Sequence, residues 1–199
     1  MKLDLAKDLL QKETPTNKWL IKDTDAKIIR AKSKDIKLPL SVENELIMKK
    51  LIDFVRYSQD PSINEKDNGD YLRPAVGLAA PQIGANINMF FIRFEEEDSS
   101  EEYAIINGRI ISKSVQIITI ESGEGCLSVD KDYVGFVPRS YKIEFEGFDW
   151  LTKKNIKKTF SGYHSIVFQH ELDHINGKLY YDWINKKAPE EINHDWIYI

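Results

Sequence analysis

The pattern of apolar and polar positions predicts a helix, then a series of short strands, then a second helix. Ser41, followed by Glu43 and Glu45, is typical of a helix start, and the helix is expected to continue to about Tyr57. Its expected buried stripe comprises Ile47, Leu51, Ile52 and Val55. Residues 60–69 are polar and rich in turn-forming types, which predicts a loop after this helix.

Short β-rich runs divided by Gly, Asp and Ser follow, as is typical of antiparallel strands. They cover residues 87–94, 103–107, 110–120, 141–148 and 155–160. A second helix is expected from near Tyr163, with Asn176 and Gly177 as its stop signal. This order predicts an α+β fold in which antiparallel sheets pack around the second helix.

The second helix contains the sequence His-Glu-Leu-Asp-His at residues 170–174. On a helix His170 and His174 are four residues apart, so both imidazoles are expected to face one ion. The opposite face carries Phe168, Leu172 and Ile175, which are the expected core contacts. Glu171 lies beside the first histidine, where a carboxylate reaches a water on the metal without binding the metal. This HExxH pattern predicts a hydrolytic metal site.

An open catalytic site needs a third protein ligand. The extended zinc-peptidase pattern would place a histidine at position 180, but this residue is Tyr180. The best remaining candidate is the only cysteine, Cys126, which lies in Gly-Glu-Gly-Cys-Leu-Ser at residues 123–128. The glycines allow a sharp turn that brings a thiolate and neighbouring N–H groups to an ion. The alternative is a buried cysteine that acts as a small apolar side chain.

A third segment of interest covers residues 76–84 and consists mostly of small side chains, with Gln82 near its end. Small side chains suit a wall along which an extended substrate runs, and a carboxamide donates a hydrogen bond to a developing oxyanion. Taken alone, the segment could equally be a tight turn that carries a surface glutamine.

Together the three segments resemble the signature motifs of the peptide deformylases, GxGxAAxQ, EGCLS and HExDH, in the same order. They match residues 75–82, 124–128 and 170–174 of this chain, and flanking similarity extends from about Trp19 to Ile184. The long stretch between Arg56 and Leu72, the form GEGCLSVD and the strand-like end at residues 197–199 resemble the second, mainly Gram-positive type of the family.

The resemblance implies a metal-dependent hydrolase that removes the formyl group from the initiator methionine of new proteins. It implies one divalent ion, Fe²⁺ in the cell, with Ni²⁺, Co²⁺ or Zn²⁺ as substitutes in purified protein, held by Cys126, His170 and His174. Glu171 would take the proton of the attacking water. The Gln82 amide and the Leu127 backbone N–H would donate to the oxyanion.

The implied substrate is a formyl-methionyl nascent peptide that pairs with the backbone beside Val76 and Gly77. The residues expected to bind it are Val76, Gly77, Gly125, Ile166, Val167 and Arg139. For Val76, Ile166 and Val167 the alternative is plain core packing. Glu124 and Asp173 are expected to orient ligands, or else to be surface charges.

Two positions depart from the family pattern. Ala75 replaces a glycine, and we expect its backbone to adopt an ordinary conformation that tolerates a methyl group. Asn107 is followed by Gly108, whereas the family often has a proline at this position. The change affects the stiffness of the loop and not the chemistry.

Composition and charge restrict the remaining possibilities. The chain has 199 residues, of which 42% are apolar, and we expect one domain over residues 1–199 with residues 1–18 as an N-terminal extension. The net charge of −4, with lysines interspersed among acids, argues against broad nucleic-acid binding and limits any ribosome contact to a local one. The lack of an apolar run near the start and the single cysteine favour a cytoplasmic protein without membrane association, and the family resemblance implies a bacterial one. We expect a monomer.

Two other functions are considered. A thermolysin-like metallopeptidase would use Glu190 or Glu191 as the third ligand, but their spacing from His174 is slightly short and Gln82 would have no role. A non-catalytic binder of nascent N-termini would have no reason to keep Glu171 together with all three ligands.

Overall fold

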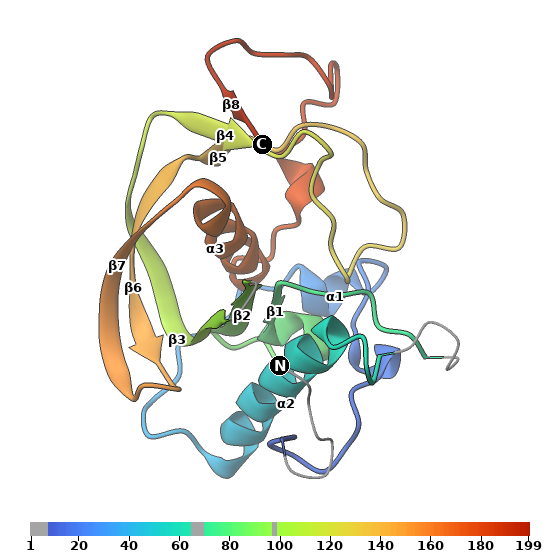
Figure 1. Cartoon of the computed structure of the whole chain (residues 1–199), viewed down its shortest axis with the longest axis vertical. Helices are drawn as coiled ribbons and strands as arrows, with labels where there is room; N and C mark the ends of the chain where they lie inside the picture. Colours follow the sequence, from blue (N-terminus) through green and yellow to red (C-terminus); the bar gives the residue numbers. More distant parts are fainter. Residues whose placement is uncertain (1–7, 65–69, 97–98) are drawn as a thin grey trace.

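The computed structural model describes residues 8–64, 70–96 and 99–199, and the fold combines two sheets with a central helix (Figure 1). The larger sheet has the antiparallel strand order β1-β2-β3-β6-β7. Its strands are β1 (Gly77–Ala79), β2 (Met89–Glu95), β3 (Ser100–Lys113), β6 (Lys142–Asp149) and β7 (Lys154–Ser161). The smaller sheet has the order β5-β4-β8, with β5 (Arg139–Ser140), β4 (Ile117–Thr119) and β8 (Ile197–Tyr198). The predicted α+β class is confirmed.

Helix α2 (Val42–Gln59) begins as the sequence predicts. Ser41 is its N-cap, and its Oγ accepts a hydrogen bond from the Asn44 N–H at 3.2 Å. The buried stripe includes Leu51, Ile52 and Val55, which pack in one core cluster with apolar residues of β1 and β2. Figure 1 shows α2 below the larger sheet, on the side away from α3. The predicted loop at residues 60–69 is described only as far as residue 64, where it forms turns.

The region of residues 100–113 differs from the prediction of two strands, because β3 is continuous through it. The pairing of β3 with β6 shifts register between Ile106 and Arg109, and Asn107 has a φ of 53° at this irregularity. The Asn107 side chain bonds both the N–H and the C=O of Ile36, at 2.9 and 2.8 Å. A Cβ at Gly108 would lie 2.8 Å from Ile105 and Phe145 side chains, so close packing excludes a larger residue there.

Helix α3 (Gly162–Ile175) lies in the middle of the molecule, between the curved strands β3, β6 and β7 and the segments that carry the smaller sheet (Figure 1). Phe168, Leu172 and Ile175 are buried in the core cluster against the larger sheet, as their spacing predicts. The helix ends before Gly177, which has a φ of +68° and whose added Cβ would lie 2.7 Å from the carbonyl carbon of Arg30. The predicted glycine stop is therefore confirmed.

Three short helical segments and one short α-helix complete the described part of the chain. These are η1 (Asn17–Trp19), α1 (Ala26–Ile29), η2 (Ala80–Ile83) and η3 (Tyr180–Asp182). Before them, the backbone N–H groups of Leu10 and Gln11 donate to the Asp53 carboxylate of α2 at 3.0 and 3.1 Å. The start of the predicted N-terminal extension, residues 1–7, lies outside the described residues.

The strand-like end of the chain is also as expected. Ile197 of β8 pairs with Ile118 of β4 in parallel, and the Ile199 N–H donates to the Thr119 C=O at 3.1 Å. No helix within residues 8–64, 70–96 and 99–199 has the length and apolar character that a membrane span requires.

Candidate metal and hydrolytic site

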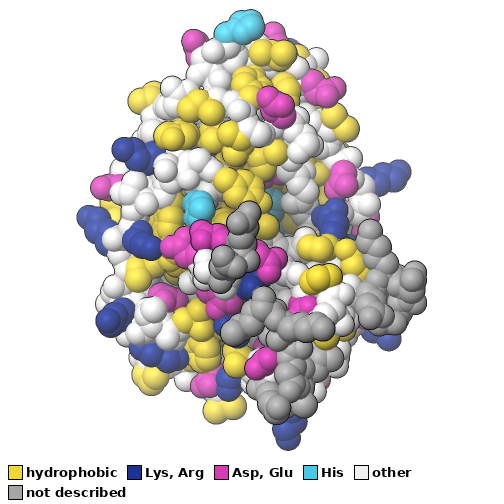
Figure 2. All heavy atoms as spheres, in the orientation of Figure 1, with side chains coloured by type: hydrophobic (Ala, Val, Ile, Leu, Met, Phe, Trp, Pro, Cys, Tyr) yellow, Lys and Arg dark blue, Asp and Glu magenta, His cyan; other side chains and the backbone are white. Residues whose placement is uncertain are grey.

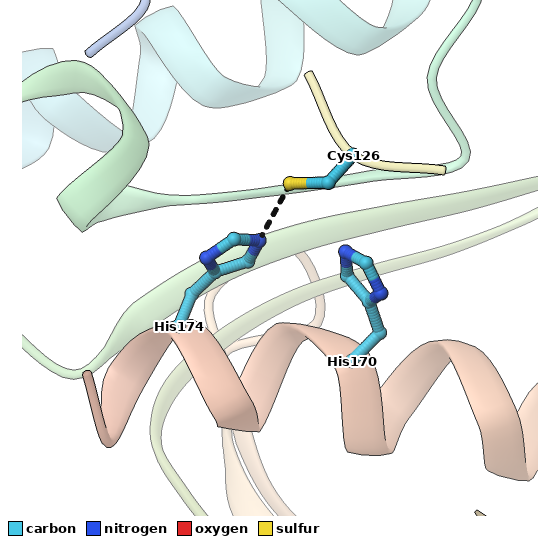
Figure 3. A group of neighbouring side chains, drawn as sticks. All are labelled: Cys126, His170 and His174. Atoms are coloured by element: carbon cyan, nitrogen blue, oxygen red, sulfur yellow. Dashed lines mark hydrogen bonds between the residues drawn. The ribbon is translucent and has the colours of Figure 1, made fainter. Parts of the chain in front are cut away.

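Cys126, His170 and His174 lie together in the structure. Their ligand atoms are all within 4.8 Å of one another, and Cys126 Sγ is 3.3 Å from His174 Nε2. Figure 3 shows the two imidazoles rising from α3 toward the thiol, which comes from a separate segment above the helix. The i, i+4 spacing places the histidines on one helix face, and the loop between Gly123 and Gly125 brings the cysteine to it.

The donor set fits a divalent ion. A thiolate and an imidazole on one tetrahedral ion would be about 3.5 Å apart, close to the separation of Cys126 and His174. His174 Nδ1 and Glu171 Oε2 are buried and have no hydrogen-bond partner among the residues that the structure describes. An ion bound by one sulfur and two imidazole nitrogens, with a water against Glu171 Oε2, would satisfy this donor set and the unpaired carboxylate oxygen.

His170 is oriented by a carboxylate behind it. Its Nδ1 lies 2.8 Å from Glu124 Oε2, and this contact assigns the proton to Nδ1 and leaves Nε2 free to act as a ligand. Burial would raise the pKa of Glu124, but Arg139 and His170 outweigh burial and lower that pKa to about 2. Glu124 therefore stays charged and holds the imidazole, which agrees with the ligand-orienting role expected from the sequence.

Arg139 is buried between two acids. Its Nε and Nη2 donate to Glu124 at 2.7 and 2.9 Å, and its Nη1 donates to Asp173 at 2.5 Å. Asp173 also accepts from the Trp183 indole N–H at 2.7 Å. Sequence reasoning expected Arg139 along the peptide path, but the guanidinium does not line the cavity at Cys126 and is committed to this network.

Glu171 lies on the side of the site next to β1. Its carboxylate packs against the backbone of Gly77, where an added Cβ would lie 2.8 Å from Glu171 Cδ. Burial raises the pKa of Glu171 to about 7, with a further contribution from the charge of Glu124. Gly77 of the first motif therefore leaves space for the carboxylate of Glu171 in the third motif.

Gln82 is held with its amide nitrogen toward the cysteine. Gln82 Oε1 accepts from the Ala79 N–H at 2.9 Å, and Nε2 lies 3.6 Å from Cys126 Sγ and 3.3 Å from Ser128 Oγ. The interpretation of Gln82 as a surface side chain is wrong, because only 2% of it is exposed. On the other side of Cys126, Leu127 has a backbone N–H with no acceptor among the hydrogen bonds of the described residues, although its C=O accepts from Lys22 Nζ at 2.8 Å.

A cavity of about 470 Å³ opens beside these groups. It brings together five of the six residues expected to bind substrate, Val76, Gly77, Gly125, Ile166 and Val167, with the side chains of Gln82, Cys126, His170 and Glu171. In the view of Figure 2, hydrophobic side chains gather in the upper half of the face, with histidine visible beside them. Val167 also packs in the core cluster, so the pocket and core interpretations both hold for this residue.

Sequence reasoning missed several residues of this cavity, including one arginine and one tyrosine. Arg73 and Tyr163 line it, and the Arg73 guanidinium lies against the backbone of Gly125. Arg73 also forms an ion pair with Asp132, which lies in the loop after Ser128; Arg73 Nη1 and Asp132 Oδ1 are 3.6 Å apart. The sequence signal for Arg73 is weak, since a single arginine before a proline is common in loops; only its place directly before the first motif could have indicated it.

The metallopeptidase alternative lacks its third ligand. Glu190 and Glu191 are exposed, and among the described residues the candidate metal group contains neither of them. The Ala75 departure is also settled, because residue 75 is not among the non-glycine residues with positive φ, and its N–H and C=O bond Ser58 and Gln59 of α2.

A buried group of one cysteine and two histidines beside a buried carboxylate, on an α+β frame, is typical of metal-dependent hydrolases. Residues 18–190 match the polypeptide deformylase family. The chain is 41% identical to peptide deformylase 2 of Bacillus cereus, over 87% of this chain and 92% of that protein. It is also 41% identical to a peptide deformylase of Levilactobacillus brevis, over 92% and 97%.

Solved structures agree with this. Arabidopsis thaliana peptide deformylase 1B in complex with an inhibitor is 26% identical and superposes with a TM-score of 0.65, over 84% of this chain and 82% of that one. A peptide deformylase of Acinetobacter baumannii bound to Met-Ala-Ser is 20% identical with a TM-score of 0.65, over 83% and 96%, and supports the fold. The chain belongs to the peptide deformylase family.

Proposed function

We propose that the cavity at Cys126 is the active site for removing the N-formyl group from formyl-methionyl peptides, which releases formate and a free amino terminus. Membership of the peptide deformylase family supports the reaction. The observation that carries the assignment to this site is the group of Cys126, His170 and His174, of which Cys126 and His170 line one cavity together with Glu171 and Gln82.

Cys126 Sγ, His170 Nε2 and His174 Nε2 are proposed as the protein ligands of one divalent ion. When bound, the ion would supply Lewis acidity that polarises the formyl oxygen and makes a water molecule more acidic. We propose Fe²⁺ as the ion in the cell, because the resemblance to the family points to it; Ni²⁺ and Co²⁺ are expected to substitute, and Zn²⁺ to work less well.

Glu171 is proposed as the group that moves the proton. Its carboxylate is buried beside Gly77, and Oε2 has no hydrogen-bond partner among residues 8–64, 70–96 and 99–199. An oxygen in this state accepts the proton of the attacking water and then donates it to the departing amine. The backbone of Gly77 lies against the carboxylate and limits its movement within the cavity.

Gln82 and Leu127 are proposed as the donors to the tetrahedral oxyanion. The Ala79 N–H fixes Gln82 Oε1, so the amide N–H₂ group faces Cys126, and the Leu127 N–H follows Cys126 directly in the chain. Donors fixed before the reaction stabilise developing charge without reorganising, and the loss of one typically costs about 2.7–4 kcal/mol of barrier.

The substrate is proposed to enter as an added strand. β1 is the edge strand of the larger sheet, so its outer backbone groups beside Gly77 are free to pair with an extended peptide. The methionine side chain would then occupy the apolar part of the cavity, next to Val76, Ile166 and Val167. Gly125 and Arg73 would face the residues after methionine.

Other properties remain proposals. We propose one domain over residues 1–199, a monomer, a bacterial cytoplasmic location and only a local contact with the ribosome. The strand β8 at the end of the chain, together with the form of the second motif, supports the second type of the family.

The test is formate release from a formyl-Met peptide, assayed without oxygen, beside the matched acetyl-Met peptide. We expect cleavage of the first and almost none of the second, because Gln82, Leu127 and Glu171 leave little room for an added methyl group. Comparable rates on both would contradict this geometry. Cleavage of an internal peptide bond would support the metallopeptidase, and tight binding without formate release would support the non-catalytic binder.

A further inference from the structure

The two oxyanion donors proposed above, Gln82 and Leu127, belong to segments that are far apart in the chain. Residues 21–23 are hydrogen-bonded to both segments, and we call them the bridging segment. On one side the Ile21 N–H donates to the C=O of Gln82 at 2.7 Å. On the other side the Lys22 ammonium donates to the C=O of Leu127 at 2.8 Å. The proposed function gives the bridging segment no role.

Two more hydrogen bonds close a ring around the donors. The Asp23 N–H donates to the C=O of Ser128 at 2.7 Å. The amide nitrogen of Gln82 in turn donates to Ser128 Oγ at 3.3 Å. Gln82 is therefore held at its backbone by the bridging segment, and at its side chain by a residue that the same segment holds. A shift of the bridging segment would change the distance between the two donors.

Lys22 acts on this ring through its side chain. Its Nζ lies 2.8 Å from the Leu127 oxygen and 3.3 Å from Asp130 Oδ1. The Asp130 side chain is 55% exposed, so water and salt screen this ion pair. The hydrogen bond from the ammonium to the carbonyl is charge-assisted and has the shorter distance. The contact of Lys22 that fixes a geometry is therefore the one with Leu127.

A fixed carbonyl at Leu127 restricts the N–H of the same residue. The two groups belong to adjacent peptide units, and each unit is planar, so only the two backbone torsions of Leu127 separate them. On the far side of the carbonyl, the Ser128 N–H lies 3.4 Å from Cys126 Sγ, which holds the following peptide unit against the thiol. With its carbonyl held from both directions, Leu127 keeps its N–H aimed at one point. Donors fixed in this way stabilise developing charge without reorganising.

We propose that Lys22 is a positioning residue for deformylation, which holds the Leu127 carbonyl so that the Leu127 N–H and the Gln82 amide face the same developing oxyanion. This inference rests on the proposed function. Lys22 is not among the described residues that line the cavity at Cys126, so its effect passes through Leu127 and not through contact with the peptide. Its loss should weaken stabilisation of the transition state more than binding of the substrate.

The first test is the kinetics of Lys22→Met, which removes the ammonium and keeps a long side chain. We expect kcat for a formyl-Met peptide to fall between about 3-fold and about 30-fold, because misplacing a donor should cost less than the about 10²–10³-fold of removing one. KM should change less than about 2-fold, as expected when an interaction made only in the transition state is lost. Lys22→Arg, whose guanidinium can also donate to the carbonyl, should recover most of kcat.

The second test measures binding to the metal-loaded protein, without turnover. One ligand is a methionyl peptide in which an H-phosphonate, a tetrahedral and anionic group, replaces the formyl group. The other ligand is the product peptide with its free amine. Lys22→Met should weaken binding of the H-phosphonate peptide by about the factor lost in kcat/KM and leave binding of the product unchanged. A general loss of structure would weaken both and lower the thermal unfolding midpoint, which should stay the same because Lys22 is 38% exposed.

Two control variants separate the contact with Leu127 from other effects of a lysine. Asp130→Asn removes the ion pair and leaves Lys22 free to hold the carbonyl, so kcat should stay within about 2-fold. Lys18→Met removes an exposed positive charge shortly before the bridging segment and should have no effect on either test.

Three results would each overturn the proposal. They are an unchanged kcat and H-phosphonate affinity in Lys22→Met, a loss in Asp130→Asn as large as that in Lys22→Met, and a rise in KM with kcat retained. The proposed function is tested separately by the parent protein, because a parent that releases no formate contradicts the function itself. A parent that releases formate at the same rate as Lys22→Met contradicts only the role of Lys22.

Discussion

The carboxylate of Glu171 occupies the space where any side chain at position 77 would lie. A Cβ on Gly77 would be 2.8 Å from Glu171 Cδ, well inside the distance that carbon atoms keep. Gly77 is the first residue of β1, and Glu171 lies on α3, so the contact joins the first sequence motif to the third. Glycine is required here because of this approach and not because of its own backbone angles.

Gly77→Ala should therefore displace Glu171 while leaving the three ligands in place. We expect kcat/KM for a formyl-Met peptide to fall at least about 10²-fold, the scale of a misplaced acid–base group, with metal content retained. The comparison is Gly125→Ala, where the nearest side-chain atom to an added Cβ would be 3.7 Å away on Arg73, so any loss there should come from weaker peptide binding and not from a displaced Glu171. If Gly77→Ala keeps full activity, the carboxylate has an equally good position elsewhere.

Glu171→Gln keeps the shape of this side chain and removes its ability to take a proton. We expect a folded, metal-replete protein with a turnover at least about 10²-fold lower, because general acid–base catalysis contributes on this scale. Metal analysis and formate release on the same preparation separate the two effects. Near-normal turnover with full metal would assign proton transfer to another residue.

Cys126→Ala should lower metal content and abolish deformylation, since only His170 and His174 would remain as protein ligands. A readout independent of turnover is the absorption spectrum of the Co²⁺ form, in which thiolate ligation gives a charge-transfer band that the variant should lack. Glu190→Ala and Glu191→Ala serve as controls, because both side chains are exposed and lie outside the group. Loss of metal in these controls, with full metal in Cys126→Ala, would favour the peptidase.

Sequence signals within one short segment are sufficient to predict the helix that carries His170, Glu171 and His174. The spacing of His170 and His174, the apolar residues on the opposite face and the stop at Gly177 are all properties of one helix, so periodicity and backbone preference are sufficient. The two strands predicted on either side of Asn107 are one strand in the structure. Sequence rules treat glycine as a break, whereas here an irregularity at positive φ lets β3 continue.

Contacts between distant segments were harder to predict. Arg139 and Glu124 meet because a two-residue strand and a glycine-rich loop approach the same side of α3, and neither residue carries a local signal for the other. The place of Gln82 depends on the Ala79 N–H and on Ser128, which come from different parts of the site. For Cys126, the order of three motifs indicated the ligand role that its own neighbourhood left open.

The Arg139 network gives a prediction about stability. Arg139→Met would leave Glu124 and Asp173 without their buried cation, and removing one partner of a buried pair costs about 3–5 kcal/mol. The measurement is the free energy of unfolding by urea, made on protein loaded with the same metal. The control is Arg109→Met, whose exposed pair with Glu146 should be worth less than about 1 kcal/mol. Equal effects of the two substitutions would contradict a buried supporting role.

The last prediction concerns the working ion. Two imidazoles and a thiolate suit zinc as well as iron, and intrinsic affinity tends to favour later metals over Fe²⁺. Thiolate donation also leaves an ion less electrophilic than three histidines would, so the reaction should depend on an ion that accepts a further ligand readily. We expect apo-protein reconstituted under argon to be most active with Fe²⁺, active with Ni²⁺ or Co²⁺ and slower with Zn²⁺. Air should inactivate the iron form, by oxidising the iron or the Cys126 thiolate that binds it. A zinc form that is fastest, together with an iron form that survives oxygen, would show that iron is not the working metal, while the ligand set would stand.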